Sequence, residues 1–391
     1  MTRETDPTPL PEEPRAGLLA QAREAFAALG RIGRDIPEVD SFALVTFAPV
    51  PLIALGAVFG GIWPWLALLW IAGLIFALDR LIARAAPDAP EGSEFPAADG
   101  LSVALGLTHF LLLFVVVGAL SGVTGISWPA RIALLIATGM FFGQVSNSNA
   151  HELIHRADKR LFTLGKWVYI SLLYGHHTSA HRLVHHRFVA TPGDPNTAVL
   201  GESFWSFAPQ AWIGAFRAGW EMERNLREAV PRGEARPLRA RLAALNPYVT
   251  YVLGGLWFVV LIGTIFGLSG VIAYLFLCLY AQMQILLADY VQHYGLLRRA
   301  LDEERYEPVT EAHSWDAPDP VSSLFMLNAP RHSDHHAHPA RPYPALRLGD
   351  LRAPGRPVLP RSLPAMATLA LIPPLWHRVM DHRVLALRKG A

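Results

Sequence analysis

The chain has 391 residues, of which 52% are hydrophobic and 17% are charged, and its formal net charge is +2. Soluble proteins carry about 25% charged residues, so this composition indicates a membrane protein. The net charge says little about a nucleic-acid partner, but the sequence has no basic stripe interleaved with aromatic residues, and no such partner is expected. The single cysteine, Cys278, excludes intrachain disulfides and metal sites made of several thiolates.

Residues 1–40 are polar and rich in proline, and they precede the first apolar run. They lack the basic start and apolar core of a cleaved signal peptide. Within them, residues 16–28 form either a short interfacial helix or part of a loosely ordered tail. The sequence therefore divides into an N-terminal tail at residues 1–40 and one membrane-embedded catalytic domain at residues 41–391.

Six apolar segments have about the length of a membrane-spanning helix, which takes roughly 20 residues. The uncharged stretch at 41–78 contains two of them, separated at Gly60-Gly61, and a polar loop at 79–100 follows. A second long uncharged stretch contains the last two, separated near Gly267. The predicted fold is all-α, an integral membrane protein with six transmembrane helices at residues 41–59, 62–78, 101–120, 131–147, 248–267 and 270–290.

Two further apolar segments are too short to cross a membrane. Residues 161–174 fit an interfacial or re-entrant segment, and residues 363–376, which contain Pro373-Pro374, fit an interfacial helix. Residues 202–241 are rich in arginine and are expected outside the bilayer.

The distribution of basic residues predicts the orientation. Six spans place both ends of the chain and the segments at 79–100 and 148–246 on one face of the membrane. Arginine and lysine concentrate on this face, so the positive-inside rule makes it cytoplasmic. We expect a multi-pass protein of the inner (plasma) membrane, with a cytoplasmic N-terminal tail and a catalytic site that faces the cytoplasm.

Histidines gather in four clusters, all on that face, in the motifs NSNAHELIHR, HRLVHHR, DYVQHYG and RHSDHHAHP. The four-residue spacing of His151 and His155 places both imidazoles on one side of a helix. Neutral imidazole suits iron, zinc, copper and nickel. The clusters contain more candidate ligands than one ion can take, which indicates two metals: His151, His155, His181, His185, His186, His293, His332, His335 and His336.

Three classes of protein fit such clusters. The HELIH motif matches the HExxH of zinc metalloproteases, with Glu152 as the general base, but a catalytic zinc takes only three protein ligands. A pair of irons uses all nine histidines and supports oxygen chemistry. A metal-storage or transport protein would need polar residues along a path through the membrane, and the first three spans offer almost none.

The histidine motifs, with VATPGDP, GESFWSF and HYGLLR, resemble those of the integral-membrane alkane monooxygenases, a branch of the membrane fatty-acid desaturase and hydroxylase superfamily. The resemblance covers residues 147–343. It implies a non-haem di-iron site formed by the nine histidines, which uses O2 and two electrons to hydroxylate a terminal methyl of a hydrocarbon, alkane to 1-alkanol. Alternatives within the superfamily are an aromatic-methyl (xylene-type) monooxygenase and a lipid desaturase or hydroxylase.

The chain has no flavin or dinucleotide motif and no CxxC pair, so electrons must come from a separate carrier. The resemblance implies a rubredoxin or ferredoxin with an NAD(P)H reductase, and hydrocarbon substrate and membrane lipid as further partners. The expected docking surface is a set of arginines: Arg217, Arg224, Arg227, Arg232, Arg236, Arg239 and Arg241.

The chain departs from the family pattern at two points. Ala180 and Gln292 stand where the family usually has Glu, and Asp289 is the candidate to supply the missing charge. These changes leave every candidate ligand in place and put the substrate in doubt. Residues expected to support the ligands, chiefly by accepting their second N–H, are Glu152, His176, Asp194, Asp289 and Asp334. For Asp194 a turn-forming role is the alternative. His109 is expected to be a packing residue.

Overall fold

The computed structural model describes residues 27, 30–32, 34–82, 84–229, 245–303 and 305–390. Over these residues the regular structure is helical, apart from two isolated β-bridges. The prediction of an all-α fold is therefore confirmed. The helix expected at residues 16–28 lies almost entirely outside the described residues.

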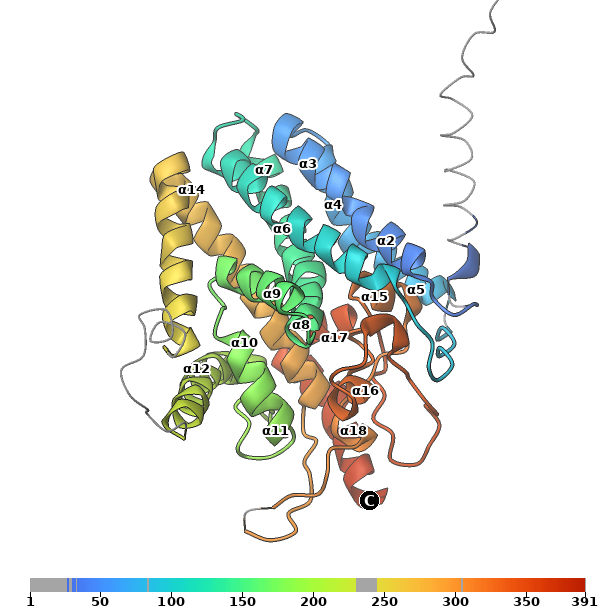
Figure 1. Ribbon diagram of the computed structural model, residues 1–391. Helices are drawn as coiled ribbons and strands as arrows, with labels where there is room; N and C mark the ends of the chain where they lie inside the picture. The colour runs from blue at the N-terminus through green and yellow to red at the C-terminus, as the bar shows by residue number, and fades with distance from the viewer. Residues whose placement is uncertain are drawn as a thin grey trace, which may run out of the picture.

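Five helical segments of the described chain are long and apolar enough to cross a membrane: Val39–Phe59, Trp63–Ile82, Ala97–Ser121, Trp128–Ile154 and Pro247–His293. In Figure 1 the first segment consists of α2 (Val39–Phe47) and α3 (Pro49–Phe59), and the second of α4 (Trp63–Leu68), η1 (Leu69–Leu74) and α5 (Ile75–Ile82). The third segment is α6 (Ala97–Ser121), and the fourth consists of α7 (Trp128–Phe141), η2 (Phe142–Ser146) and α8 (Asn147–Ile154). The fifth segment is α14 (Pro247–His293). The chain is a multi-pass membrane protein.

Helix α14 contains both segments predicted as the fifth and sixth spans. It is 47 residues long, and its helical geometry is interrupted at Gly267, where φ is 67° and ψ is −166°. Glycine has no Cβ, so it adopts this conformation without the steric penalty that other residues meet. Figure 1 shows the result as two arms that meet at a sharp bend.

The second spanning segment is longer than predicted. It continues to Ile82, so Asp79 lies within helix α5 and is buried, not in a polar loop. The Oδ1 of Asp79 accepts hydrogen bonds from the backbone N–H groups of Val321 (2.8 Å) and Ser322 (3.1 Å). These groups lie at the start of α15 (Pro320–Phe325), where a helix has N–H groups without intrahelical partners. These two hydrogen bonds explain how the Asp79 carboxylate can be buried near the end of an apolar helix.

The predicted interfacial segments form helices with other limits. The first is α9 (Lys159–Ser171), which packs against α8 and is capped by Asp158, whose Oδ1 accepts from Arg160 N at 2.6 Å. The second is two helices, α17 (Leu363–Ala370) and α18 (Pro373–Gly390). The prolines begin α18, since proline fits the first turn of a helix. The single helix predicted at 363–376 was therefore wrong.

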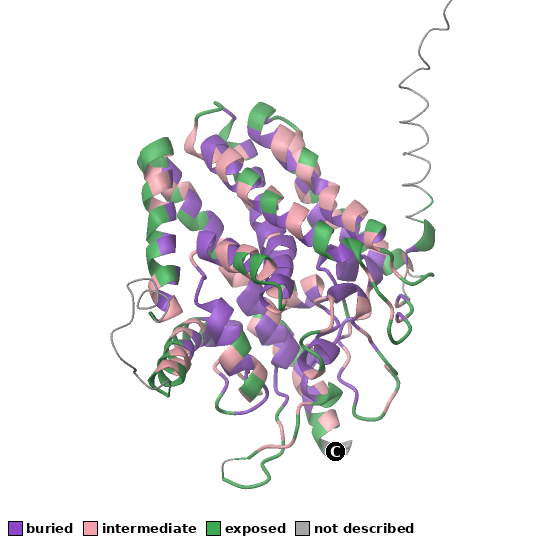
Figure 2. Cartoon of the chain, in the orientation of Figure 1, coloured by how far each residue is buried: buried purple, intermediate pink, exposed green. Residues whose placement is uncertain are grey.

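The spanning helices expose apolar side chains on their outer surfaces. Leu107, Leu268 and Phe276 are 61%, 75% and 57% exposed. Figure 2 shows that buried residues concentrate at the centre of the molecule, where α8, α14 and α16 (His332–Ala337) meet. An apolar exterior around a buried centre is the pattern expected when lipid surrounds the helices.

Candidate metal centre

The structure brings the nine candidate histidines into two groups. Within each group the candidate ligand atoms all lie within 4.8 Å of one another. The five-histidine group is His151, His155, His181, His186 and His335, and the four-histidine group is His185, His293, His332 and His336. Residues far apart in the sequence thus form two compact sets of imidazoles.

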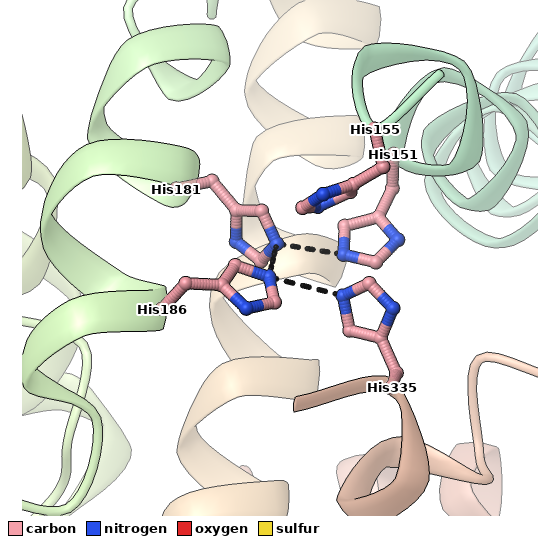
Figure 3. Close-up of side chains that lie close together, drawn as sticks. All are labelled: His151, His155, His181, His186 and His335. Atoms are coloured by element: carbon pink, nitrogen blue, oxygen red, sulfur yellow. Dashed lines mark hydrogen bonds between the residues drawn. The ribbon is translucent and has the colours of Figure 1, made fainter. Parts of the chain in front are cut away.

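The five-histidine group joins three parts of the chain. His151 lies on α8, His155 directly follows it, and His335 lies on α16. Figure 3 shows the five rings pointing toward one another. The Nε2 atom of His181 lies 2.7 Å from that of His151 and 3.0 Å from that of His186, and the Nε2 atoms of His186 and His335 are 3.1 Å apart. Ring nitrogens that converge in this way are arranged as ligands of one cation are.

The four-histidine group has the same character. The Nε2 atom of His332 lies 3.0 Å from that of His293, at the end of α14, and 3.1 Å from that of His336 on α16. The Nδ1–H of His293 donates to the carbonyl of His313 at 3.3 Å. This contact fixes the tautomer of His293 and leaves its Nε2 lone pair directed at the group.

The second histidine motif contributes to both groups because of its local backbone. The chain runs through α10 (His177–Ala180), the π-helical turn η3 (His181–His185) and α11 (His186–Phe188). A π-helical turn is wider than an α-helical one, so residues five apart become neighbours. His181 therefore pairs with His186, while His185 joins the other group.

Asp194 holds His185. Its Oδ2 accepts from His185 Nδ1–H at 2.8 Å and from Thr197 Oγ1 at 2.7 Å, and the carboxylate is buried. Burial alone would raise the pKa of Asp194, but His185 and Thr197 outweigh it and hold that pKa below its usual value. The orienting contact expected of Asp194 is therefore present in the structure.

Asp334 does not make the contact that its position between the histidines suggested. Its carboxylate accepts from His338 Nδ1 at 3.0 Å and pairs with Arg341, and it accepts no hydrogen bond from the nine histidines. The hydrogen bond to a ligand that was expected of Asp334 is therefore not present among the described residues. Because His338 and Arg341 lie just beyond α16, Asp334 instead fixes the chain that leaves this helix.

Asp316 performs a role that the sequence analysis missed. Its carboxylate accepts from Ser333 N at 2.9 Å and from Ser333 Oγ at 2.6 Å, and Arg356 donates to it at 2.7 Å. Burial raises the pKa of Asp316 to about 6, against the lowering effect of Arg356. These contacts fix the start of α16, which supplies three of the histidines. Asp316 lies outside the histidine motifs, and no spacing rule pointed to it.

The two histidines before the second motif have different surroundings. The ring of His176 packs against Trp212 and Phe216, with centroids 5.0 and 5.2 Å away. The ring of His177 stacks on that of His181 at 4.9 Å. The structure therefore places His177, not His176, beside the candidate ligands.

Glu152 is engaged with an arginine. It is buried and pairs with Arg156 at 3.2 Å, and Arg156 also pairs with Asp99 at 2.7 Å. This arrangement ties α8 to the start of α6. Since the carboxylate is engaged with Arg156, the geometry does not favour the general-base role of a zinc protease.

A small cavity of about 50 Å³ touches both groups through His151, His181 and His332. Asp289 also lines it, and the Oδ2 of Asp289 accepts from Asn196 Nδ2 at 2.6 Å. Gln292, another lining residue, donates to the carbonyl of Ala329 at 3.0 Å. Asp289 is therefore the carboxylate that adjoins the cavity.

Burial favours the neutral, metal-binding form of the imidazoles. Burial is the larger cause and the positive charge of neighbouring histidines the smaller one. Together they hold the pKa well below 6.5 in His181, His186, His332, His335 and His336. His185 differs, because burial lowers its pKa but Asp194 raises it more. Ligating histidines commonly have such a carboxylate partner.

The residues present fit metal ions. Among the described residues, His155 Nε2 and His185 Nε2 are buried without a hydrogen-bond partner, and each belongs to one of the groups. Burying a polar atom without a partner costs free energy, and one metal ion in each group would give both nitrogens a partner. Sites made of imidazole alone suit iron, zinc, copper or nickel. The centre is thus a histidine-rich metal-binding site where membrane helices end.

The fold and the site define a membrane protein with a histidine-rich metal centre. The chain belongs to the fatty acid desaturase family, whose sequence model matches residues 126–369. It is similar to alkane 1-monooxygenase 2 of Pseudomonas aeruginosa, with 33% identity over 89% of this chain and 92% of that protein. It is 29% identical to alkane 1-monooxygenase 2 of Alcanivorax borkumensis, over 87% of this chain and 89% of that protein. A more distant relative is the hydroxylase component of xylene/toluene monooxygenase of Pseudomonas putida, 26% identical over 82% of each chain.

Proposed function

We propose that this protein is a membrane alkane hydroxylase, which uses O2 and two electrons to convert a terminal methyl group of a hydrocarbon into a primary alcohol. The observation that carries the proposal is the convergence of nine imidazoles into two groups around one small cavity. The similarity to alkane 1-monooxygenases over most of the chain names the substrate class.

Each histidine group would hold one non-haem iron ion. When bound, the two irons would supply the activation of O2 that attack on an unactivated C–H bond requires. The chain's own contribution is to position and enclose them. Asp194 and the carbonyl of His313 orient two imidazoles, and the burial of the groups excludes water from the site.

The membrane arrangement follows from the bend in α14. If each arm of α14 crosses the membrane, the described chain has six spans. In support, Figure 1 places the bend of α14 near the α6–α7 and α3–α4 turns, at the end of the bundle remote from α16. The histidine groups then face the cytoplasm under the positive-inside rule. Residues 1–40 would be the cytoplasmic tail and residues 41–391 the catalytic domain of an inner-membrane protein.

Electrons would come from a rubredoxin or ferredoxin with its NAD(P)H reductase. The expected docking arginines lie in part on α12 (Phe204–Glu228), where Arg217 is exposed. Arg224 pairs with Glu228 at 3.8 Å and Arg227 pairs with Glu223, so their charges are partly neutralised. Arg232, Arg236, Arg239 and Arg241 lie outside the described residues. On α12, Arg217 is thus the arginine to test.

The direct test is a product assay. Protein reconstituted in lipid vesicles with a rubredoxin, its reductase and NADH should convert n-octane to 1-octanol, and a His335→Ala variant should not. Parallel assays with p-xylene and with a fatty acid distinguish the related activities. Oxidation of p-xylene alone would replace the proposal with the aromatic-methyl alternative, which the similarity to the xylene/toluene enzyme component keeps open.

A further inference from the structure

A large groove, mainly apolar but also lined by Arg361, Arg378, His382 and Arg383, lies outside the histidine centre. It has a volume of about 1180 Å³ and is formed by helices α4, α5, α7, α14, α17 and α18. Ile71, Ile136 and Leu287 are among its lining residues, and Phe76, 47% exposed, also lines it. Because these helices carry apolar exteriors, the groove is placed to receive a hydrocarbon from the lipid.

The groove and the small cavity at the histidines are neighbours. Gln144 and Gln284 line the groove, whereas the adjacent residues Gly143 and Ile285 line the cavity. The Nε2 of Gln144 donates to the Oε1 of Gln284 at 3.2 Å. This hydrogen bond joins α14 to the α7–α8 span directly beside two residues that line the cavity.

The two glutamines hold each other in place. An amide group in apolar surroundings is costly unless it is hydrogen-bonded, and each glutamine supplies the other's partner. Gly143 makes room for them, because a Cβ at that position would lie 2.4 Å from both the Cβ and the Cγ of Gln284. The pair is thus a fixed polar contact in the lining of the groove.

The size of the small cavity limits what can pass. Its volume of about 50 Å³ is about a third of that of an apolar cavity that binds benzene, roughly 150 Å³. A methyl group at the end of an unbranched chain fits such a space, but an aromatic ring does not. A substrate that enters this cavity from the groove must therefore present a slim chain end.

We propose that the groove binds the hydrocarbon chain and that the Gln144–Gln284 pair is the specificity-determining stop, which admits a terminal methyl group to the histidine cavity and holds back wider groups. This proposal rests on the hydroxylase function proposed above and adds to it the route of the substrate and the residues that select it. Neither glutamine is needed for the oxidation itself.

The test compares two substrates in the Gln284→Ala and Gln144→Ala variants. The probes are n-octane, with a slim end, and p-xylene, whose methyl group is attached to a ring. Each variant should raise the ratio of kcat/KM for p-xylene to that for n-octane by about tenfold or more, since one or two missing carbons in a pocket commonly change discrimination by that much. The control is Gln210→Ala, an exposed glutamine of α12 that bonds only within its own helix.

The outcomes are distinct. If both variants still oxidise n-octane and the ratio of kcat/KM for the two substrates is unchanged, the proposal is overturned. Loss of all oxidation in a variant that keeps wild-type metal content and thermal stability would also overturn it, because a stop is not needed for the chemistry. If one variant does not fold, the other decides. A wild-type protein that oxidises neither probe would count against the hydroxylase function itself.

Discussion

The Nε2 atoms of His181 and His186 lie 3.0 Å apart, although the residues are five positions apart in the sequence. In an α-helix the neighbours on one face are three or four positions apart. The π-helical turn His181–His185 changes this pairing and sends His185 to the four-histidine group. One short segment thereby supplies both groups and fixes their separation.

The proposed ligands should be separable from the other histidines by substitution. Alanine at His155, His186, His293 or His335 should lower hydroxylation at least about 10–100-fold, because lost contacts at a metal have effects of this size. His109, which bonds Ser171 at 2.8 Å inside the helix bundle, serves as a control that should keep most activity. Wild-type turnover in the His293→Ala variant would show that this histidine is not a ligand.

Asp194 should act through His185. The Asp194→Asn change keeps the side-chain size but removes the charge that orients the Nδ1–H of His185, so metal affinity should fall about 10–100-fold. The measurement is metal content after dialysis against a chelator. The control is Asp350→Asn, since Asp350 is exposed and its side chain accepts a hydrogen bond only from Arg352 N. Equal metal retention in the two variants would argue against the orienting role.

Membrane topology can be measured with single cysteines in a Cys278→Ala background. We expect an impermeant maleimide to label Val123→Cys and Leu268→Cys from the periplasmic side, because both residues lie at turns and are 72% and 75% exposed. Arg352→Cys should react only after the membrane is permeabilised. Labelling of Leu268→Cys from the same side as Arg352→Cys would mean that α14 does not cross twice.

The sequence predicted much of the fold and of the centre, for physical reasons. The spans follow from uncharged runs, and the bend in α14 follows from Gly267. The histidine motifs indicated which imidazoles would meet. Their division into two groups could not be predicted, because it depends on the π-helical turn at His181–His185 and not on spacing alone.

The supporting residues were harder to predict, because their roles depend on contacts between distant segments. Asp316 reaches α16 only through the folded chain, and Asp334 turns to Arg341 and His338. Similarly, the choice between His176 and His177 depends on which way each ring points from α10 and the residue before it.

Electron supply should depend on a second protein. The lone Cys278 is buried in α14 and cannot form a rubredoxin or iron–sulfur site. Purified protein with NADH alone should therefore be inactive, and a rubredoxin or ferredoxin with its reductase should restore turnover.

The same assay tests the docking surface. Carriers of this kind are commonly acidic, and exposed charges are screened within about 8 Å at physiological ionic strength. Added salt should therefore slow turnover, and the Arg217→Glu change should mimic added salt. Unchanged carrier dependence in the Arg217→Glu variant would place docking on another surface.

The central claim is that each histidine group holds one iron ion, and elemental analysis of anaerobically purified, active protein tests it most directly. The two groups contain five and four imidazoles, more in total than one six-coordinate ion can bind, so we expect close to two irons per chain. Alanine at His186 in one group, or at His336 in the other, should lower that number. One zinc and no iron in protein that is active would contradict the account.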